Sequence, residues 1–268
     1  MVDHELLLKK LEAYGILNTE LKWCWSYLTG RKQVIHLDGK ESSEELMEHG
    51  VPQGSILGPL FFILFINDLL LHVSSQVDLY ADDTTLTASA HFNDLPGLTL
   101  SLNISANEVR QWAASNKLPI NESKSKVLTI NGKHLASKIN DELLVTVEDN
   151  RLVNVKSATL LGLTIDSSFS FDCHVENLCK KLASHIGVLS KIRALLSLKQ
   201  RLLFYNVITR PVMSYADVIW SSCDKNLLNR VLKLQKRAAR IILYADRLAP
   251  SVTLFNTLDG YLFTNRVK

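Results

Sequence analysis

Two adjacent carboxylates interrupt a strand-forming stretch in Leu79-Tyr80-Ala81-Asp82-Asp83-Thr84-Thr85-Leu86. The flanking residues are β-branched, aromatic or apolar and alternate with polar ones, which predicts a β-hairpin with Asp82 and Asp83 at or beside its turn. Neighbouring carboxylates repel each other unless a cation lies between them, and hard oxygen ligands of this kind suit Mg²⁺, which also binds substrate phosphates. The hairpin is therefore a candidate metal site for phosphoryl or nucleotidyl transfer, and the alternative is an ordinary solvated turn.

A second distinctive segment lies about 30 residues earlier and combines a punctuated loop with an apolar run. It reads Gly50-Val51-Pro52-Gln53-Gly54-Ser55-Ile56-Leu57-Gly58-Pro59, and residues 60–66 are all apolar. Glycine and proline fix a tight backbone path, and glycine lets a ligand approach the main chain closely. We expect a loop in which Gln53 hydrogen-bonds a base or a sugar, followed by a helix. A plain turn before a core helix is the alternative.

These two segments, in this order, resemble the reverse transcriptases of non-LTR (LINE-like) retrotransposons. The resemblance continues through Tyr27-Leu28-Thr29-Gly30-Arg31-Lys32-Gln33, through residues 118–126 and through Leu160-Leu161-Gly162-Leu163-Thr164-Ile165-Asp166, and so covers nearly the whole chain. It implies an RNA-directed DNA polymerase that transfers nucleotides by a two-metal mechanism. Its expected partners are an RNA template, a DNA primer and deoxynucleoside triphosphates.

The resemblance also implies roles for individual residues. Asp82 and Asp83 would bind the catalytic Mg²⁺, with Mn²⁺ as an alternative ion. Lys124 would approach the triphosphate of the incoming nucleotide and stabilise or protonate the leaving pyrophosphate, and Lys126 is a near-equal candidate. The residues implied in substrate binding are Pro52, Gln53, Gly54, Tyr80 and Ala81, and those implied in gripping the primer are Leu161, Gly162 and Leu163.

The chain departs from the family pattern at its N-terminal end. The family's other metal-binding aspartate lies on a strand upstream of the position that residues 1–6 match. Asp3 follows that strand, so we expect it to be a helix N-cap and not a replacement ligand. Two-metal transfer needs ligands that clamp both ions. The sequence therefore predicts a truncated element, and the alternative function is a catalytically inactive relic that binds RNA or RNA–DNA through basic helices.

Positive charge is concentrated in the C-terminal part of the chain. Between Cys179 and Arg240 there are 13 lysines and arginines against two aspartates, a local net charge of +11, whereas the whole chain carries +3. Basic residues at this density within helical periods are typical of a surface that contacts a phosphate backbone. A solvated helix face is the alternative. The candidate nucleic-acid contacts are Lys233, Lys236, Arg237 and Arg240.

Length and composition predict a folded protein without a membrane span. The chain has 268 residues, 47% of them hydrophobic and 21% charged. Its longest apolar run, residues 60–66, is far shorter than the roughly 20 residues of a spanning helix. The polar start Val2-Asp3-His4-Glu5 is unlike a secretion signal. We therefore expect an intracellular protein, nuclear or cytoplasmic.

The predicted fold is α+β and has three parts. Residues 1–49 are expected to be a remnant of fingers and palm that opens with one helix over residues 4–28. Residues 50–170 are expected to form a palm-like sheet with helices, including a helix over residues 93–116 that packs Trp112 into the core, with the N-terminal part of the palm missing. Residues 171–268 are expected to form a helical thumb-like region, with one helix spanning residues 198–215 and bent near Pro211.

Overall fold

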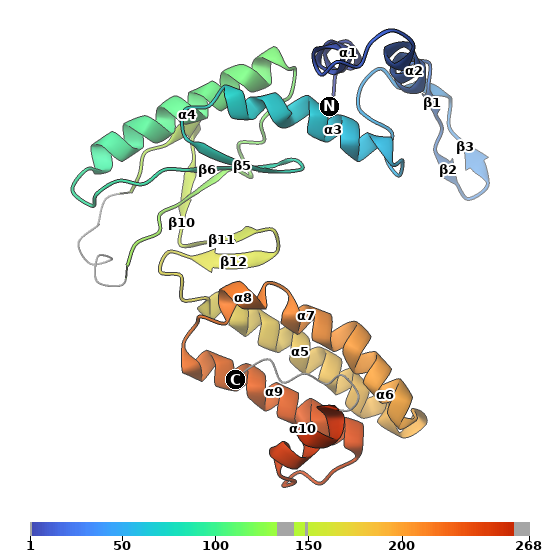
Figure 1. Ribbon diagram of the computed structural model, residues 1–268, viewed down its shortest axis with the longest axis vertical. Helices are drawn as coiled ribbons and strands as arrows, with labels where there is room; N and C mark the ends of the chain where they lie inside the picture. The colour runs from blue at the N-terminus through green and yellow to red at the C-terminus, as the bar shows by residue number, and fades with distance from the viewer. Residues whose placement is uncertain (1, 133–141, 148–149, 260–268) are drawn as a thin grey trace. The chain divides into compact units, whose positions relative to one another are not determined.

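The computed structural model describes residues 2–132, 142–147 and 150–259, and combines helices with small sheets (Figure 1). The chain divides into two compact units. The first consists of residues 1–127 and 139–154, and the second consists of residues 128–138 and 155–268. The described strands pair two by two into six two-stranded sheets. No helix within the described ranges has both the length and the apolarity needed to cross a bilayer.

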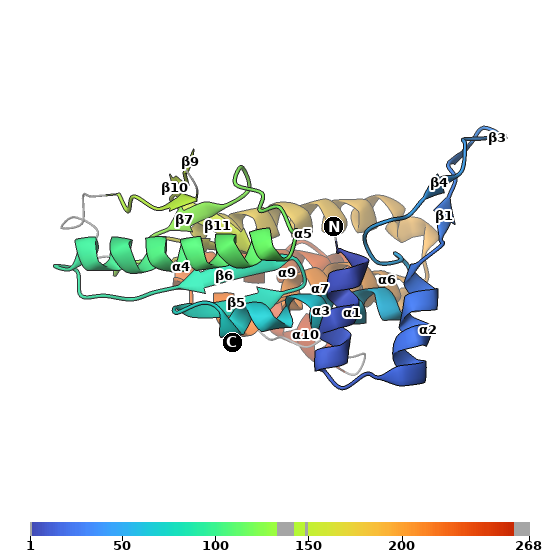
Figure 2. The ribbon, with the colours of Figure 1, turned by 90° about the horizontal axis from the view of Figure 1, so that it is seen from above.

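In its described residues, the first unit contains four α-helices, one 3₁₀-helix and short strands. Its helices are α1 (His4–Ala13), α2 (Asn18–Leu28), α3 (Leu57–Ile66), the 3₁₀-helix η1 (Asn67–Leu71) and α4 (Leu95–Ser115). The strands described before residue 156 are β1 (Lys32–Gln33), β2 (His36–Leu37), β3 (Lys40–Glu41), β4 (Glu45–Leu46), β5 (Gln76–Tyr80), β6 (Asp83–Thr87), β7 (Lys126–Leu128), β8 (Thr146–Val147), β9 (Asn150–Arg151) and β10 (Val153–Val155). Figure 2 shows α4 running along the hairpin of β5 and β6, where it contacts β6.

The prediction of one continuous helix over residues 4–28 is wrong, because the helix is interrupted between α1 and α2. Gly15 adopts a φ of +88°, and the amide of Ile16 bonds the carbonyl of Leu11 at 3.0 Å. A left-handed glycine with such a backward hydrogen bond is a common way to end a helix. The N-cap prediction is confirmed, because the Leu6 amide donates to Asp3 Oδ1 at 3.0 Å.

Helices α1 to α4 enclose the main core of the first unit. Its buried side chains include Leu7, Leu11, Phe61, Phe65 and Trp112. The prediction that Trp112 packs into the core is confirmed, since only 6% of the residue is exposed. The predicted helix over residues 93–116 is also confirmed and begins at Asp94, whose side chain accepts a hydrogen bond from the Gly97 amide.

A partly buried ion pair crosses this core. Lys10 Nζ lies 2.7 Å from Asp68 Oδ1 and donates to the Phe65 carbonyl at 2.6 Å. The indole of Trp112 donates to the same Asp68 oxygen at 3.1 Å. Burial lowers the pKa of Lys10, while the hydrogen bond and charge of Asp68 oppose that shift. The pair joins α1, the end of α3 and α4, which are far apart in the sequence.

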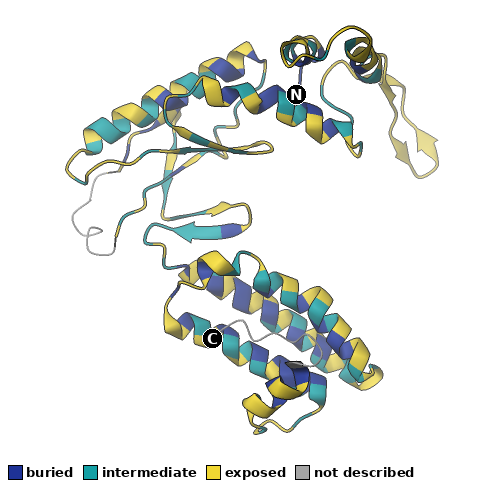
Figure 3. Cartoon of the chain, in the orientation of Figure 1, coloured by how far each residue is buried: buried dark blue, intermediate teal, exposed yellow. Residues whose placement is uncertain are grey.

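The described part of the second unit contains one hairpin and a bundle of helices. Its elements are β11 (Ser157–Leu160), β12 (Leu163–Asp166), α5 (Asp172–Ile192), the 3₁₀-helix η2 (Arg193–Leu195), α6 (Leu198–Phe204), the π-helix η3 (Tyr205–Thr209), α7 (Arg210–Ser214), α8 (Asp217–Trp220), α9 (Lys225–Leu243) and α10 (Ser251–Asp259). The helix predicted over residues 198–215 is interrupted by the π-helix. Pro211 in the first turn of α7 cannot donate a backbone hydrogen bond, which accounts for the change of helical pattern before it. Figure 3 shows buried inner and exposed outer faces on these helices.

Arg201 is a buried cation whose hydrogen bonds go to backbone carbonyls. Only 8% of the residue is exposed. Its guanidinium donates to the carbonyls of Ile242 at 2.8 Å, Leu196 at 2.9 Å and Arg193 at 3.3 Å, and it lies over the ring of Tyr244. These carbonyls belong to helix C-terminal ends, where the helix dipole is negative and favours a cation.

Asp166 organises the connection from β12 to α5. It accepts hydrogen bonds from the amides of Ser168, Ser170 and Phe171 and from the two serine hydroxyls, at 2.7 to 3.1 Å. Partial burial raises the pKa of this carboxyl, but the hydrogen bonds led by Ser170 and Ser168 outweigh burial and lower the pKa to about 2. Only the ionised form can accept all of these bonds.

We predict that Asp166→Asn destabilises the protein by about 1–2 kcal/mol at pH 7. Because the folded pKa is below the ordinary value of 3.8, the stabilisation is fully present above about pH 4 and is lost as the pH falls towards 2. Urea denaturation of both proteins between pH 7 and pH 2.5 should therefore show a difference that shrinks with acid. Asp38→Asn, in the exposed β2–β3 turn, controls for the lost charge, and a pH-independent difference would contradict the prediction.

Candidate active site

The Asp82-Asp83 segment forms the predicted hairpin. Strands β5 and β6 pair antiparallel from Gln76 opposite Thr87 to Tyr80 opposite Asp83. Ala81 and Asp82 form the two-residue turn, and Ala81 has a φ of +50°. Both aspartates are exposed. The β-ladder therefore holds the backbone on both sides of the two carboxylates while their side chains stay open to solvent.

No group of three or more histidine, cysteine or acidic side chains lies close enough to hold a metal within residues 2–132, 142–147 and 150–259. Asp82 and Asp83 are therefore considered as a pair. Mg²⁺ is commonly held by one or two protein carboxylates and completes its shell with water and substrate phosphates. Two exposed, adjacent carboxylates fit such an ion.

The predicted binding loop over residues 50–59 is held at its start by the N-terminal segment. The Gly50 amide donates to the Val2 carbonyl at 2.7 Å, and His4 Nε2 donates to the Gly50 carbonyl at 2.7 Å. Gly50 and Gly54 adopt φ values of +90° and +79°, which glycine tolerates and other residues disfavour. Gln53 and Gly54 are exposed and Pro52 is half-buried, so the middle of the loop is open to a ligand.

Ser55 and Gly58 fix the end of this loop, although neither was predicted to have a role of its own. Ser55 Oγ donates to the Pro52 carbonyl at 2.9 Å and accepts from the Gly58 amide at 2.9 Å. A Cβ on Gly58 would lie 2.4 Å from the Pro52 carbonyl oxygen. A serine that can bond the backbone on both sides, followed three residues later by glycine before an apolar run, was the available signal for this tight entry into α3.

Lys124 lies in a turn that Asn121 supports. The Lys124 amide donates to the carbonyl and to Oδ1 of Asn121, each at 3.2 Å. Its side chain is exposed, and so is that of Lys126 at the start of β7. Both lysines therefore stay candidates for contact with a triphosphate.

One hydrophobic cluster supports the three candidate segments of the first unit. Val51 in the loop, Leu79 before the aspartates and Ile120 before Lys124 all pack against the core of α1 to α4. The structure thus brings the bases of the loop, the hairpin and the lysine turn onto one core, although these residues are far apart in sequence.

The predicted primer-gripping residues form the turn of the β11–β12 hairpin in the second unit. Leu160 pairs with Leu163, so that Leu161 and Gly162 are the two turn residues. Leu163 is buried in the core of the second unit with Met213 and Trp220. Leu161 is 41% exposed.

Helix α9 carries the predicted basic contacts on one face, and its amphipathic character is confirmed. Val231, Ala238 and Ile242 are fully buried on the inner face. Lys233 and Arg237 are exposed on the outer face, whereas Lys236 and Arg240 are half-buried. The helix contains six basic residues and no acidic one. Arg240 Nη2 also donates to the Ala249 carbonyl at 3.2 Å, which partly commits this residue to the fold.

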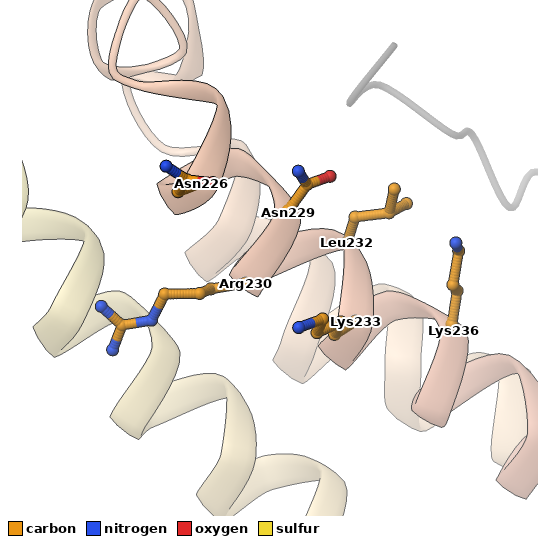
Figure 4. A pocket seen from close by; sticks show the side chains of 6 residues that line it. All are labelled: Asn226, Asn229, Arg230, Leu232, Lys233 and Lys236. Atoms are coloured by element: carbon orange, nitrogen blue, oxygen red, sulfur yellow. The ribbon is translucent and has the colours of Figure 1, made fainter.

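A groove of about 390 Å³ lies along the outer face of α9 (Figure 4). It is lined by Asn226, Asn229, Arg230, Leu232, Lys233 and Lys236. Figure 4 shows Lys236 and Asn229 directed away from the helix axis. Burial raises the pKa of the Cys179 thiol on α5, and the charge of Arg230 opposes that shift, so Arg230 acts on the neighbouring helix. Amide and cationic donors without an intervening carboxylate are suited to phosphate oxygens.

Comparison with known proteins identifies the class. Residues 1–165 match the family profile described as reverse transcriptase (RNA-dependent DNA polymerase), and this chain belongs to that family. The match includes the loop, the carboxylate hairpin and the turn before β12.

Three of the similar curated proteins come from mobile elements of Drosophila melanogaster. The chain is 29% identical over 243 residues to the probable RNA-directed DNA polymerase from transposon X-element of Drosophila melanogaster, covering 87% of this chain and 26% of that protein. It is 26% identical over 228 residues to the RNA-directed DNA polymerase from mobile element jockey of the same fly, covering 81% of this chain and 24% of that protein. It is 27% identical over 278 residues to the probable RNA-directed DNA polymerase from transposon BS, covering 96% of this chain and 29% of that protein.

These comparisons confirm the resemblance to reverse transcriptases of non-LTR retrotransposons. The chain spans about a quarter of the length of these relatives. Members of the family generally use a divalent metal and act on a nucleic-acid template and nucleotide substrates. The alternative of an inactive binding relic is not favoured by the relatives, which are described as polymerases.

We predict that Gly58→Ala lowers the free energy of unfolding by about 1–3 kcal/mol, because the new methyl group would meet the Pro52 carbonyl in a backbone region tied by Ser55. Urea denaturation measures the effect. Gly187→Ala in α5 is the matched control, since nothing lies within 4 Å of its added Cβ. That variant should be as stable as the original protein or more so. Equal stability of the two variants would contradict the predicted clash.

Proposed function

We propose that this chain is the palm and thumb portion of an RNA-directed DNA polymerase. In this assignment residues 1–49 belong to the fingers and palm, residues 50–170 are the palm, and residues 171–268 are the helical thumb and connection region. The observation that carries the proposal is a rigid hairpin that presents Asp82 and Asp83 from the same core that supports the 50–59 loop. Family membership supports it further.

Asp82 and Asp83 would hold a divalent ion, Mg²⁺ or in its place Mn²⁺. Their exposure and their hard oxygen atoms favour an ion that shares its shell with substrate phosphates. Such an ion, when bound, supplies Lewis-acid stabilisation of the charge that develops during transfer. The two aspartates themselves would hold the ion at the end of the hairpin and so determine where this stabilisation acts.

The other candidate residues would bind and orient the substrates. Pro52, Gln53 and Gly54 would line the nucleotide and template pocket, together with Tyr80 and Ala81. The primer 3′-hydroxyl would attack the deoxynucleoside triphosphate, and pyrophosphate would leave. The exposed Lys124 would stabilise or protonate that leaving group, with Lys126 as the competing candidate.

The basic face of α9 would contact the phosphate backbone. Lys233, Lys236, Arg237 and, to a smaller extent, Arg240 carry this role, because Arg240 already donates to Ala249. Their charge is uncompensated within the helix, and such a surface attracts nucleic acid without reading its sequence. An RNA template and a DNA primer as partners place the proposed activity inside the cell, in the nucleus or the cytoplasm.

The carboxylate proposal is tested by primer extension on an RNA template. We expect the double variant Asp82→Asn, Asp83→Asn to lose Mg²⁺-dependent extension by about 10²-fold or more, because metal stabilisation contributes several kcal/mol. Asp78→Asn is the control, since Asp78 is an exposed carboxylate on the same hairpin. It should keep its extension rate. Chelation of the metal should abolish extension by every variant.

Two other results would change the assignment. Extension that survives the double substitution would remove Asp82 and Asp83 from the catalytic role. Absence of extension by the unaltered chain, with salt-sensitive primer–template binding retained, would favour the binding relic over the polymerase.

The α9 proposal is tested by the salt dependence of binding. We expect Lys233→Gln and Arg237→Gln each to reduce the slope of log Kd against log salt concentration by about one for a primer–template, because each removes one phosphate contact. Fluorescence anisotropy at several salt concentrations gives the slope. Lys9→Gln, an exposed basic residue on α1, should leave the slope unchanged. Equal slopes for all three variants would argue against the α9 surface.

A further inference from the structure

The turn of the β11–β12 hairpin is held in a disfavoured conformation. Leu161 and Gly162 have φ values of +48° and +82°. Two successive positive φ values are typical of type I′ hairpin turns, where glycine, asparagine and aspartate are preferred. A leucine in this region is uncommon, and such conformations persist only where surrounding contacts determine them. The turn therefore needs a restraint from outside the hairpin.

Tyr215 supplies this restraint from the end of α7. Its hydroxyl donates a hydrogen bond to the Leu161 carbonyl. Its ring lies against Gly162, where an added Cβ would be 3.5 Å from Cε1 and 3.6 Å from the hydroxyl oxygen. One side chain thus contacts both residues of the turn, one through a hydrogen bond and the other through packing.

Tyr215 is itself fixed to the core of the second unit. The indole of Trp220 donates to the Tyr215 carbonyl at 2.9 Å. Trp220 is 1% exposed and belongs to the same buried cluster as Leu163, which follows the turn. A continuous set of contacts therefore runs from the bundle core through Trp220 and Tyr215 to the turn.

We infer that Tyr215 is the positioning residue of the Leu161–Gly162 turn and holds this turn in the shape in which it would grip the primer strand. The inference rests on the proposed function, within which the resemblance to non-LTR reverse transcriptases assigns the gripping of the primer to Leu161, Gly162 and Leu163. Leu161 and Tyr215 are 41% and 50% exposed, so the restrained surface is open to a ligand. A loop already held in its binding shape loses less conformational freedom when it binds.

The test compares Tyr215→Phe with Tyr244→Phe. The first substitution removes the hydroxyl that bonds Leu161 and keeps the ring beside Gly162. The second makes the same chemical change at an exposed tyrosine whose ring faces Arg193 and Arg201. The probes are a labelled RNA template with a recessed DNA primer and the same RNA without primer. Binding is measured by anisotropy with the full chain.

We expect Tyr215→Phe to raise the Kd for the primed template about 3- to 10-fold, which corresponds to one net hydrogen bond. Its Kd for unprimed RNA should stay at the original value, its urea midpoint should fall by no more than the loss of one hydrogen bond accounts for, and amide exchange over residues 160–163 should accelerate. Tyr244→Phe should change none of these quantities. Where extension is measured, KM for the primed template should rise and kcat should not fall.

The inference is overturned if Tyr215→Phe binds the primed template as the original chain does, or if it weakens binding of both probes equally. Because binding and amide exchange do not require turnover, this result stands apart from the extension assay. If the Asp82 and Asp83 prediction fails, the polymerase site is rejected. Binding and amide exchange of Tyr215→Phe would still show whether Tyr215 positions the turn. If the original chain binds unprimed and primed RNA equally, recognition of the primer by the turn is rejected.

Discussion

The ion pair between Lys10 and Asp68 sets the geometry on which the candidate site depends. A partly buried ammonium group is costly without a partner, and here a carboxylate, a carbonyl and two aromatic rings surround it. Asp68 lies between the loop that leads into α3 and the strand that leads to the aspartates. The ion pair therefore holds η1, which lies between the 50–59 loop and the Asp82-Asp83 hairpin in the sequence, against α1 and α4.

The acidic and basic chemistry of the chain is divided between its two compact units. The first unit presents the adjacent aspartates at a hairpin end, and the second presents a helix face with six basic residues and no acidic one. A polymerase requires both kinds of surface, because the metal requires anionic ligands and the nucleic-acid backbone requires cations.

The sequence was sufficient to predict features that depend on local patterns. The Asp82-Asp83 hairpin, the Asp3 cap, the burial of Trp112 and the amphipathic α9 all follow from alternation, capping chemistry or helical period. The break at Gly15 was predictable from the glycine but was missed, because apolar residues continue in phase on both sides of it. The bundle helix interrupted before Pro211 was missed for a similar reason.

Contacts between distant segments were beyond the reach of these patterns. Ser55 is an ordinary loop serine until the fold brings the Pro52 carbonyl and the Gly58 amide to it, and Tyr215 is separated by more than fifty residues from the turn that it restrains. Periodicity identifies which face of an element is buried, but it does not identify the partner of that face. The candidate roles of Gln53, Lys124 and Leu161 likewise came from resemblance and not from residue spacing.

The carbonyl environment of Arg201 has an electrostatic consequence for the second unit. A guanidinium paired with a carboxylate is neutralised, whereas one that is solvated by backbone dipoles keeps its full formal charge. Salt ions cannot approach a buried charge closely, so they screen it less than they screen the exposed lysines. The bundle therefore contains a buried positive charge that moderate salt screens only weakly.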